Sequence, residues 1–171
     1  MVNAIIVMGV SGCGKSSVAR AVSEKRGYRF VEGDELHPQT NVDKMTRGIP
    51  LNDEDRWPWL DKIGQVLHDA ESNKNPVVLT CSALKRTYRE RLRDTTGGPL
   101  AFIYLKGSAE LLNTRMGQRE GHFMPLSLLK TQLETLEEPT GEPGVITIDI
   151  DATLDVICEK AVSGLDQIRP D

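Results

Sequence analysis

Short apolar runs alternate with amphipathic segments along the whole chain. Each run is rich in β-branched residues and is bounded by polar residues, glycine or proline, as expected for buried strands. We expect strands at residues 4–8, 28–31, 77–80, 101–105 and 145–148. Between them apolar residues recur at helical spacing, and we expect helices at residues 16–25, 59–70, 84–93, 109–116, 126–136 and 154–165.

This alternation of strand and helix is typical of right-handed βαβ units. It predicts an α/β fold, in which a doubly wound parallel sheet of about five strands carries helices on both faces. In such sheets, ligands bind at the carboxyl ends of the strands. The Gly- and Pro-rich stretches at residues 97–99 and 139–144 are long enough only for loops. We therefore expect residues 1–171 to form a single domain.

Composition and charge narrow the range of partners. The net charge is −4, with 21 Lys and Arg against 25 Asp and Glu, so no overall basic character draws the chain to nucleic acid or anionic lipid. Cys13, Cys81 and Cys158 are an odd number and lack metal-ligand spacing, which favours a reducing compartment. The apolar stretch at residues 5–10 is far shorter than a membrane span and lacks the features of a signal peptide. We expect a cytoplasmic protein with no nucleic-acid or membrane partner.

A phosphate-binding motif directly follows the first predicted strand. Residues 9–16 read Gly-Val-Ser-Gly-Cys-Gly-Lys-Ser and match G-x-x-x-x-G-K-[ST] in the strand-to-helix context that this motif requires. Glycines allow backbone N–H groups to turn toward phosphates, and the next helix adds its positive N-terminal end. We expect Lys15 to hold the β- and γ-phosphates of ATP and Ser16 to hold Mg²⁺. The predicted nucleotide-binding residues are Gly9, Ser11, Gly12, Cys13, Gly14, Lys15, Ser16 and Ser17.

A carboxylate follows the second predicted strand, beside this nucleotide site. A phosphoryl-transfer enzyme needs such a group to orient the acceptor hydroxyl and take its proton, and Asp34 is our candidate. The alternative role for Asp34 is a helix cap. His37 is a candidate contact for the acceptor. Residues 41–48 have helical spacing and end in a glycine suited to a C-cap, which predicts a short helix over the acceptor cleft. Lys44 on this helix either contacts the acceptor or is solvated.

Further basic residues stand near helix starts, where a cation opposes the helix dipole. Arg56 follows an acidic cluster that caps the long helix, and either an anionic ligand or pairing with an aspartate of residues 53–55 explains it. Lys85, Arg89 and Arg93 fall on one helix face, and the repulsion between them indicates either a nearby anion or solvent exposure. Lys85, nearest the strand end, is the strongest candidate for an anion site, whereas we expect Arg93 at the surface.

Residues 115–127 are expected to form a hinged lid. Arg115 and Arg119 precede a Gly-His-Phe-Met-Pro sequence, in which Gly and Pro allow a hinge. An arginine over the γ-phosphate would neutralise the charge of the transition state, and we favour this role for Arg119 over Arg115. The alternative is an ordinary helix end with cations that suit its dipole. His122 either binds an acceptor carboxylate or caps a turn. On the next helix, solvation is the default for Thr131, Gln132 and Glu134.

Several blocks of the chain together resemble the gluconokinase family of P-loop small-molecule kinases. They are residues 9–16, Gly33-Asp34 with His37-Pro38, residues 50–53 with Asp55-Arg56, residues 81–85, and residues 119–123 with 131–136. Many NTPases share the phosphate loop, but the Cys-Ser-Ala-Leu-Lys and Gly-His-Phe blocks are specific to this family. Cys13 stands where relatives often carry serine, a departure at a position that phosphate binding does not require.

The resemblance implies an adenylate-kinase-like fold and the phosphorylation of D-gluconate by ATP, which gives 6-phospho-D-gluconate and ADP and feeds the pentose phosphate route. It implies ATP and Mg²⁺ as cofactors and a homodimer. The family roles would fall to Lys15 and Ser16 for nucleotide and metal, Asp34 for the acceptor hydroxyl, Arg56, Lys85 and His122 for the carboxylate of gluconate, and Arg119 on the lid.

Two other functions fit parts of the sequence. A shikimate or nucleotide kinase would share the chain length and phosphate loop, but shikimate kinases usually carry a glycine triplet after the third strand, where this chain has Cys81-Ser82-Ala83. A non-catalytic ATP-dependent switch would keep the phosphate loop and lack an acceptor site. A test of turnover on a panel of acceptors separates these functions.

Overall fold

Five parallel strands form one central sheet. The computed structural model describes residues 2–118 and 126–168. Its strands are β1 (Ala4–Met8), β2 (Arg29–Val31), β3 (Val77–Thr80), β4 (Leu100–Lys106) and β5 (Val145–Asp149), in the spatial order β2-β3-β1-β4-β5. Each pair of neighbouring strands is parallel. The predicted doubly wound parallel sheet is therefore confirmed.

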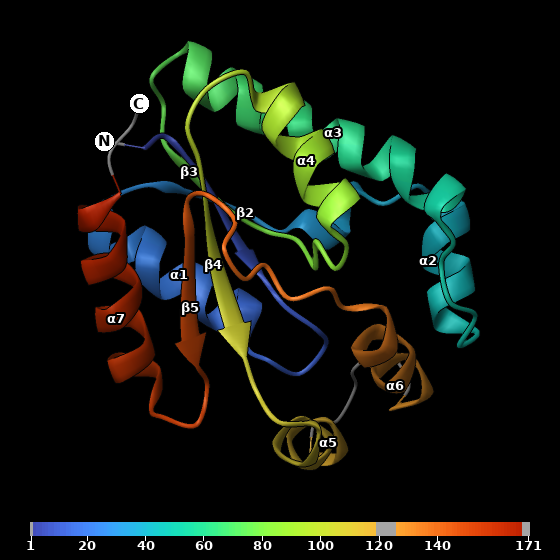
Figure 1. The fold of residues 1–171 in the computed structure, drawn as a ribbon. Helices are drawn as coiled ribbons and strands as arrows, with labels where there is room; N and C mark the ends of the chain where they lie inside the picture. Colours follow the sequence, from blue (N-terminus) through green and yellow to red (C-terminus); the bar gives the residue numbers. More distant parts are fainter. Residues whose placement is uncertain (1, 119–125, 169–171) are drawn as a thin grey trace.

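Helices cover both faces of this sheet (Figure 1). The helical segments are α1 (Lys15–Arg26), the 3₁₀ turn η1 (Gly33–Leu36), α2 (Gln39–Thr46), α3 (Asp53–Ser72), α4 (Arg86–Thr96), α5 (Ala109–Gln118), α6 (Leu126–Thr135) and α7 (Leu154–Gln167). α1 and α7 pack together on one face, and α3 and α4 pack together on the other. α5 and α6 contact each other beyond the carboxyl end of β4.

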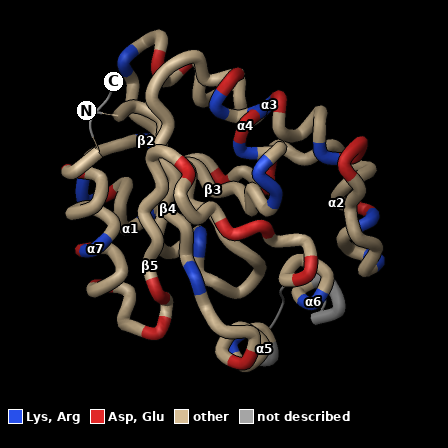
Figure 2. The backbone as a smooth tube through the Cα atoms, viewed as in Figure 1, with Lys and Arg blue, Asp and Glu red and all other residues tan. Residues whose placement is uncertain are grey.

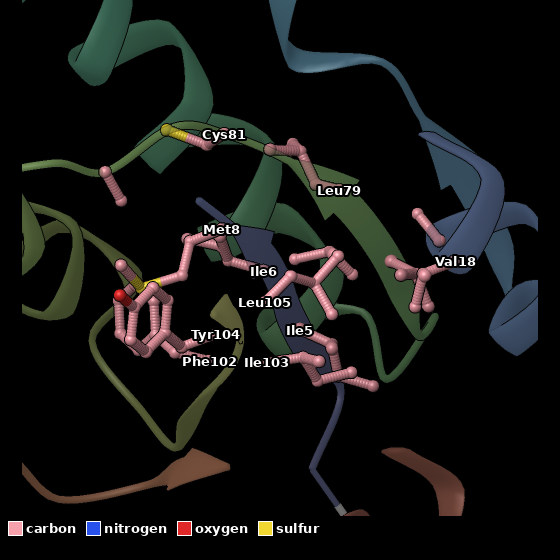
Figure 3. Close-up of a cluster of buried hydrophobic side chains, with 14 of the residues drawn as sticks. Ile5, Ile6, Met8, Val18, Leu79, Cys81, Phe102, Ile103, Tyr104 and Leu105 are labelled. Carbon is pink, nitrogen blue, oxygen red and sulfur yellow. The ribbon is translucent and has the colours of Figure 1, made fainter. Parts of the chain in front are cut away.

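The core lies around β1, the central strand, whose residues are all buried. Figure 3 shows its side chains beside those of the neighbouring strands β3 and β4 and of helix α1. The labelled residues are Ile5, Ile6, Met8, Val18, Leu79, Cys81, Phe102, Ile103, Tyr104 and Leu105. Burial of one such aliphatic or aromatic side chain stabilises the folded state by about 1.5–3 kcal/mol. A close-packed interior also has a low compressibility. The loop that follows β1 therefore rests on a rigid base.

Local capping signals set the ends of the helices near the cleft. Asn52 and Asp55 form a capping box at the start of α3, because the backbone N–H of each donates to the side chain of the other. The long helix therefore begins before the apolar pattern at residues 59–70. At the end of α2, Gly48 has a φ of 76°, and Ile49 N donates to Lys44 O at 2.8 Å. The predicted helix ending in a C-cap glycine is confirmed.

Charged residues of both signs are interspersed over the molecule, as Figure 2 shows for α3 and α4. This pattern agrees with the absence of an overall basic character in the sequence. Within residues 2–118 and 126–168, each helix is too short or too polar to cross a lipid bilayer.

Candidate active site

The phosphate loop connects the buried end of β1 to the first turn of α1. Gly9, Gly12 and Gly14 have φ angles of 146°, 84° and 93°, a region that L side chains rarely adopt. A Cβ atom on Gly9 would lie 2.7 Å from Cys13 Sγ, so the loop lacks space for one. Because α1 begins at Lys15, the positive end of its dipole lies at the loop, an arrangement that suits an anion.

Lys15 and Ser16 line a cavity at this loop. Lys15 Nζ donates hydrogen bonds to the carbonyl oxygens of Gly9 at 3.1 Å and Val10 at 3.2 Å. Ser16 Oγ donates to Glu32 Oε2 at 2.8 Å. The predicted nucleotide-binding residues that line the cavity are Ser11, Gly12, Gly14, Lys15 and Ser16. Cys13 is buried within the loop, and Ser17 is exposed on α1.

Glu32 was not predicted as a site residue, although it follows β2 directly. Its carboxylate accepts hydrogen bonds from Ser16 Oγ and from Thr80 Oγ1 at the end of β3. Thr80 Oγ1 accepts in turn from Gly33 N at 3.0 Å. Among the described residues, no cluster of three or more His, Cys, Asp or Glu side chains forms a metal site by itself. Mg²⁺ needs no such cluster, since it binds one or two protein oxygens together with substrate phosphates, and Ser16 and Glu32 supply suitable oxygens.

Asp34 and His37 line the same cavity, within and just after the η1 turn. The His37 side chain is 2% exposed and stacks on Trp59, with ring centroids 4.0 Å apart. Burial, together with the positive charge of Arg56, lowers the pKa of His37 to about 4. The imidazole is therefore neutral at neutral pH. Its Nε2 lies 3.9 Å from Asp34 Oδ1, and the Asp34 side chain is half exposed.

A close approach of β2 to β3 brings these carboxylates to the cavity. A Cβ atom on Gly33 would lie 1.8 Å from Thr80 O, so only glycine fits between the strand ends. Trp59 Nε1 donates to Gly33 O at 2.8 Å, which attaches α3 to the same turn. The chain around Gly33 therefore holds Glu32 and Asp34 on either side of one fixed backbone position.

Arg56 and Lys85 lie near each other beside the cavity. Arg56 lines it, and both residues line an open hollow beside it. Arg56 Nη1 donates to Tyr88 Oη at 2.9 Å, and Tyr88 Oη donates to Asp53 Oδ1. Lys85 Nζ donates to the same Asp53 oxygen at 3.1 Å. The hydrogen bond from Tyr88, followed by the one from Lys85, lowers the pKa of Asp53. Asp53 is therefore the counter-ion of Lys85, and Tyr88 links it to Arg56.

Lys44 is placed differently from the other predicted substrate residues. It forms an ion pair with Asp55, with N–O distances of 2.8 and 3.0 Å, and it is not among the residues that line the cavity. This pair gives Asp55 a cationic partner in addition to its role in the capping box. A contact between Lys44 and substrate would require the pair to open, and it stays a prediction.

The row of cations on α4 has a counter-ion within the protein. Arg89 is fully buried and donates to both carboxylate oxygens of Glu142, at 2.9 and 2.7 Å. It also donates to Ala83 O at 2.7 Å and Glu137 O at 2.8 Å. Arg93 Nη1 donates to Glu142 Oε1 at 3.0 Å, and its side chain is only 16% exposed. The surface position predicted for Arg93 is therefore wrong, and Glu142, distant in sequence, is the anion.

The prediction that Gln132 is solvated on the surface of its helix is also wrong. Its side-chain oxygen accepts a hydrogen bond from Ser11 N at 2.8 Å, so α6 touches the phosphate loop. Gln132 and Thr131 both line the cavity. Helical spacing could place these residues on one face of α6 but could not indicate which element that face meets.

Two predicted residues of the lid, Arg119 and His122, lie outside the described residues. Arg115 is described, and its Nη2 donates to Ile150 O at 2.9 Å, just beyond β5. This bond attaches the end of α5 to the chain just after β5, and the preference for Arg119 over Arg115 stays a prediction.

Comparison with known proteins places these features in a family. The AAA domain family matches residues 5–139. Gluconokinase from Gluconobacter oxydans is 46% identical over 158 residues, which cover 92% of this chain and 88% of that protein. Thermoresistant gluconokinase from Escherichia coli is 42% identical, with coverage of 92% and 90%.

Solved structures agree with this assignment. A crystal structure of a gluconokinase from Sinorhizobium meliloti 1021 has a TM-score of 0.89 and 53% identity, and the match covers 97% of this chain and 93% of that one. Shikimate kinase from Aquifex aeolicus has a TM-score of 0.62 with only 14% identity, so it shares the P-loop kinase fold alone. High identity over nearly the full chain is thus found with gluconokinases, and the chain belongs to the gluconokinase family of P-loop kinases.

Proposed function

We propose that the protein is a gluconokinase that transfers the γ-phosphoryl group of ATP to the 6-hydroxyl of D-gluconate. The observation that carries this proposal is the shared cavity, in which Lys15 and Ser16 of the phosphate loop lie with Asp34, His37 and Arg56. A phosphate site and a carboxylate base within one cavity suit phosphoryl transfer to a hydroxyl group. The names of the relatives, which are gluconokinases, support gluconate as the acceptor.

The phosphate loop would bind the nucleotide through its backbone N–H groups and the Lys15 ammonium group. Lys15 now donates to the carbonyl oxygens of Gly9 and Val10, and phosphate oxygens would replace these partners. Ser16 would hold Mg²⁺, with Glu32 beside it, since both supply hard oxygen atoms. When bound there, Mg²⁺ would neutralise the negative charge of the phosphates.

Asp34 would act as the base. As the 6-hydroxyl oxygen forms its bond to the γ-phosphorus, the bond to the leaving ADP oxygen breaks and the hydroxyl proton passes to the Asp34 carboxylate. The half-exposed position of Asp34 leaves room for the acceptor. Arg56 and Lys85 would bind the gluconate carboxylate in place of their present partners, which are Tyr88 for Arg56 and Asp53 for Lys85, since charged hydrogen bonds to a carboxylate are strong.

We further propose that residues 1–171 are a single kinase domain with a lid at residues 115–127. Arg119 on this lid would stabilise the γ-phosphoryl group, and His122 would contact the gluconate carboxylate. The enzyme would act as a cytoplasmic homodimer that supplies the pentose phosphate route, with no nucleic-acid or membrane partner.

A coupled assay of ADP release with Mg-ATP tests the substrate. We expect turnover with gluconate and none with shikimate, neutral glucose or nucleoside monophosphates, because only gluconate offers both a carboxylate and a distant hydroxyl in a flexible chain. Turnover of shikimate or of a nucleoside monophosphate without gluconate would keep the kinase and reject the acceptor. If no acceptor in the panel were phosphorylated while the protein still bound ATP, a nucleotide-dependent switch would be favoured.

A further inference from the structure

His37 lies between the buried side chain of Trp59 and the candidate base, Asp34. Its ring is stacked on Trp59, while Nε2 lies 3.9 Å from Asp34 Oδ1. A neutral imidazole carries its proton on one of two nitrogens and accepts a hydrogen bond at the other. The tautomer therefore decides whether His37 offers Asp34 and the acceptor a hydrogen-bond donor or a lone pair.

A buried amide on α2 determines this tautomer. Asn41 Nδ2 lies 2.9 Å from the backbone oxygen of Asp55 and 3.1 Å from His37 Nδ1. A backbone carbonyl can only accept, so the amide must direct its nitrogen rather than its oxygen toward Asp55. The same nitrogen then faces His37 Nδ1, which must be the unprotonated, accepting atom.

We propose that Asn41 is a positioning residue that holds His37 in the neutral tautomer with its proton on Nε2, so that His37 is a hydrogen-bond donor at the acceptor site and Asp34 is its base. The proposed kinase function is assumed for the role in turnover, although the tautomer itself does not depend on it. The Nε2–H group would donate to the Asp34 carboxylate or to the oxygen of the acceptor hydroxyl, and it would orient either one for transfer.

The surroundings of His37 keep its ring neutral. Burial of the ring, followed by the positive charge of Arg56 from α3, disfavours the imidazolium form, and the pKa of His37 falls to about 4. Asp34, from η1, is the carboxylate that faces Nε2. The Asp55 carboxylate is occupied by Lys44, and only its backbone oxygen reaches Asn41. His37 therefore stays neutral above about pH 5, with its Nε2 facing the Asp34 carboxylate.

Nitrogen-15 NMR of histidine-labelled, ligand-free protein tests the tautomer directly. The chain has 3 histidines, and His37→Gln identifies the His37 signals. We expect a protonated Nε2 and an unprotonated Nδ1 from about pH 5 to pH 8. A proton on Nδ1, or protonation of the ring near its usual pKa, would overturn the proposal. This measurement needs no acceptor, so it stands even where the enzyme proves not to phosphorylate gluconate.

Asn41→Asp tests the consequence for turnover. The new carboxylate would attract a proton to Nδ1 and raise the pKa of His37. We expect kcat to fall by about tenfold or more, while the KM for ATP stays unchanged. The pH profile of kcat should show an ionisation between about pH 6 and pH 8 that the parent lacks. Gln39→Glu is the matched control, because it adds the same charge at an exposed site on the same helix.

A wild-type kcat and pH profile in folded Asn41→Asp would refute the role of Asn41, as would an equal loss in Gln39→Glu. If Asn41→Asp fails to fold, Asn41→Leu removes the donor without adding charge, and the tautomer of the parent protein still decides the question. Gluconate turnover with the expected tautomer supports both proposals, and turnover with the opposite tautomer rejects this one alone.

Discussion

Glu142 is the counter-ion of two arginines, Arg89 and Arg93. Its removal tests how much this buried charge contributes to the free energy of unfolding. Arg89 is 0% exposed and Glu142 3% exposed at the side chain, and two hydrogen bonds join them. Arg89 also donates to the carbonyl oxygen of Ala83. Ala83 has a φ of 46°, and its neighbour Ser82 lines the cavity. Glu142→Ala would leave the guanidinium with the carbonyl oxygens alone.

Removal of one partner from a buried ion pair costs about 3–5 kcal/mol, because the other charge stays desolvated. Since Arg89 keeps its bonds to two carbonyl oxygens, we expect a loss near the lower end, about 3 kcal/mol. With an m value of roughly 2 kcal/mol per molar urea, the unfolding midpoint should fall by about 1.5 M. Urea denaturation followed by circular dichroism measures this shift.

The pH dependence supplies a second readout. Hydrogen bonds from Arg89, followed by those from Arg93, lower the pKa of Glu142 below its usual 4.5. The stabilisation is therefore present in full above pH 4.5 and is lost as the pH falls through the lowered folded-state pKa. Glu142→Ala should lose this part of the acid sensitivity.

Asp61→Ala is the matched control. Arg91 and Asp61 also form two hydrogen bonds, but their side chains are 42% and 52% exposed. An exposed pair contributes at most about 1 kcal/mol, so its loss should shift the midpoint far less. Similar small shifts in Glu142→Ala and Asp61→Ala would refute the argument from burial.

Two predictions concern turnover, and Glu35→Gln, at an exposed position, is the control for both. Asp34→Asn removes the proposed base, and we expect kcat to fall by about 10²–10⁴-fold with little change in ATP binding; an unchanged kcat would exclude it as the base. Glu32→Gln weakens the site beside Ser16, so half-maximal activity should require more Mg²⁺. A titration of activity with Mg²⁺ that matches the parent's would contradict this role.

Local patterns were enough to predict the fold and the phosphate loop. Strand and helix periodicity depends on neighbouring residues, and so do the motif at residues 9–16 and the C-cap at Gly48. The sequence also predicted three residues that line the cavity, Asp34, His37 and Arg56. They follow a strand or begin a helix, and such positions meet at the carboxyl ends of the strands in a parallel sheet. The order and parallel pairing of the strands agree with this expectation.

The tertiary structure decided which partner each polar side chain meets. Arg89 and Glu142 are 53 positions apart, and Ser11 and Gln132 are 121 apart, so no local pattern links them. Arg93 looked solvated only because its counter-ion lies on a distant loop. The tautomer of His37 depends on Asn41, which is itself oriented by a carbonyl of α3. Hydrogen bonds need atoms within about 3 Å, and only the packing of separate elements brings distant residues that close.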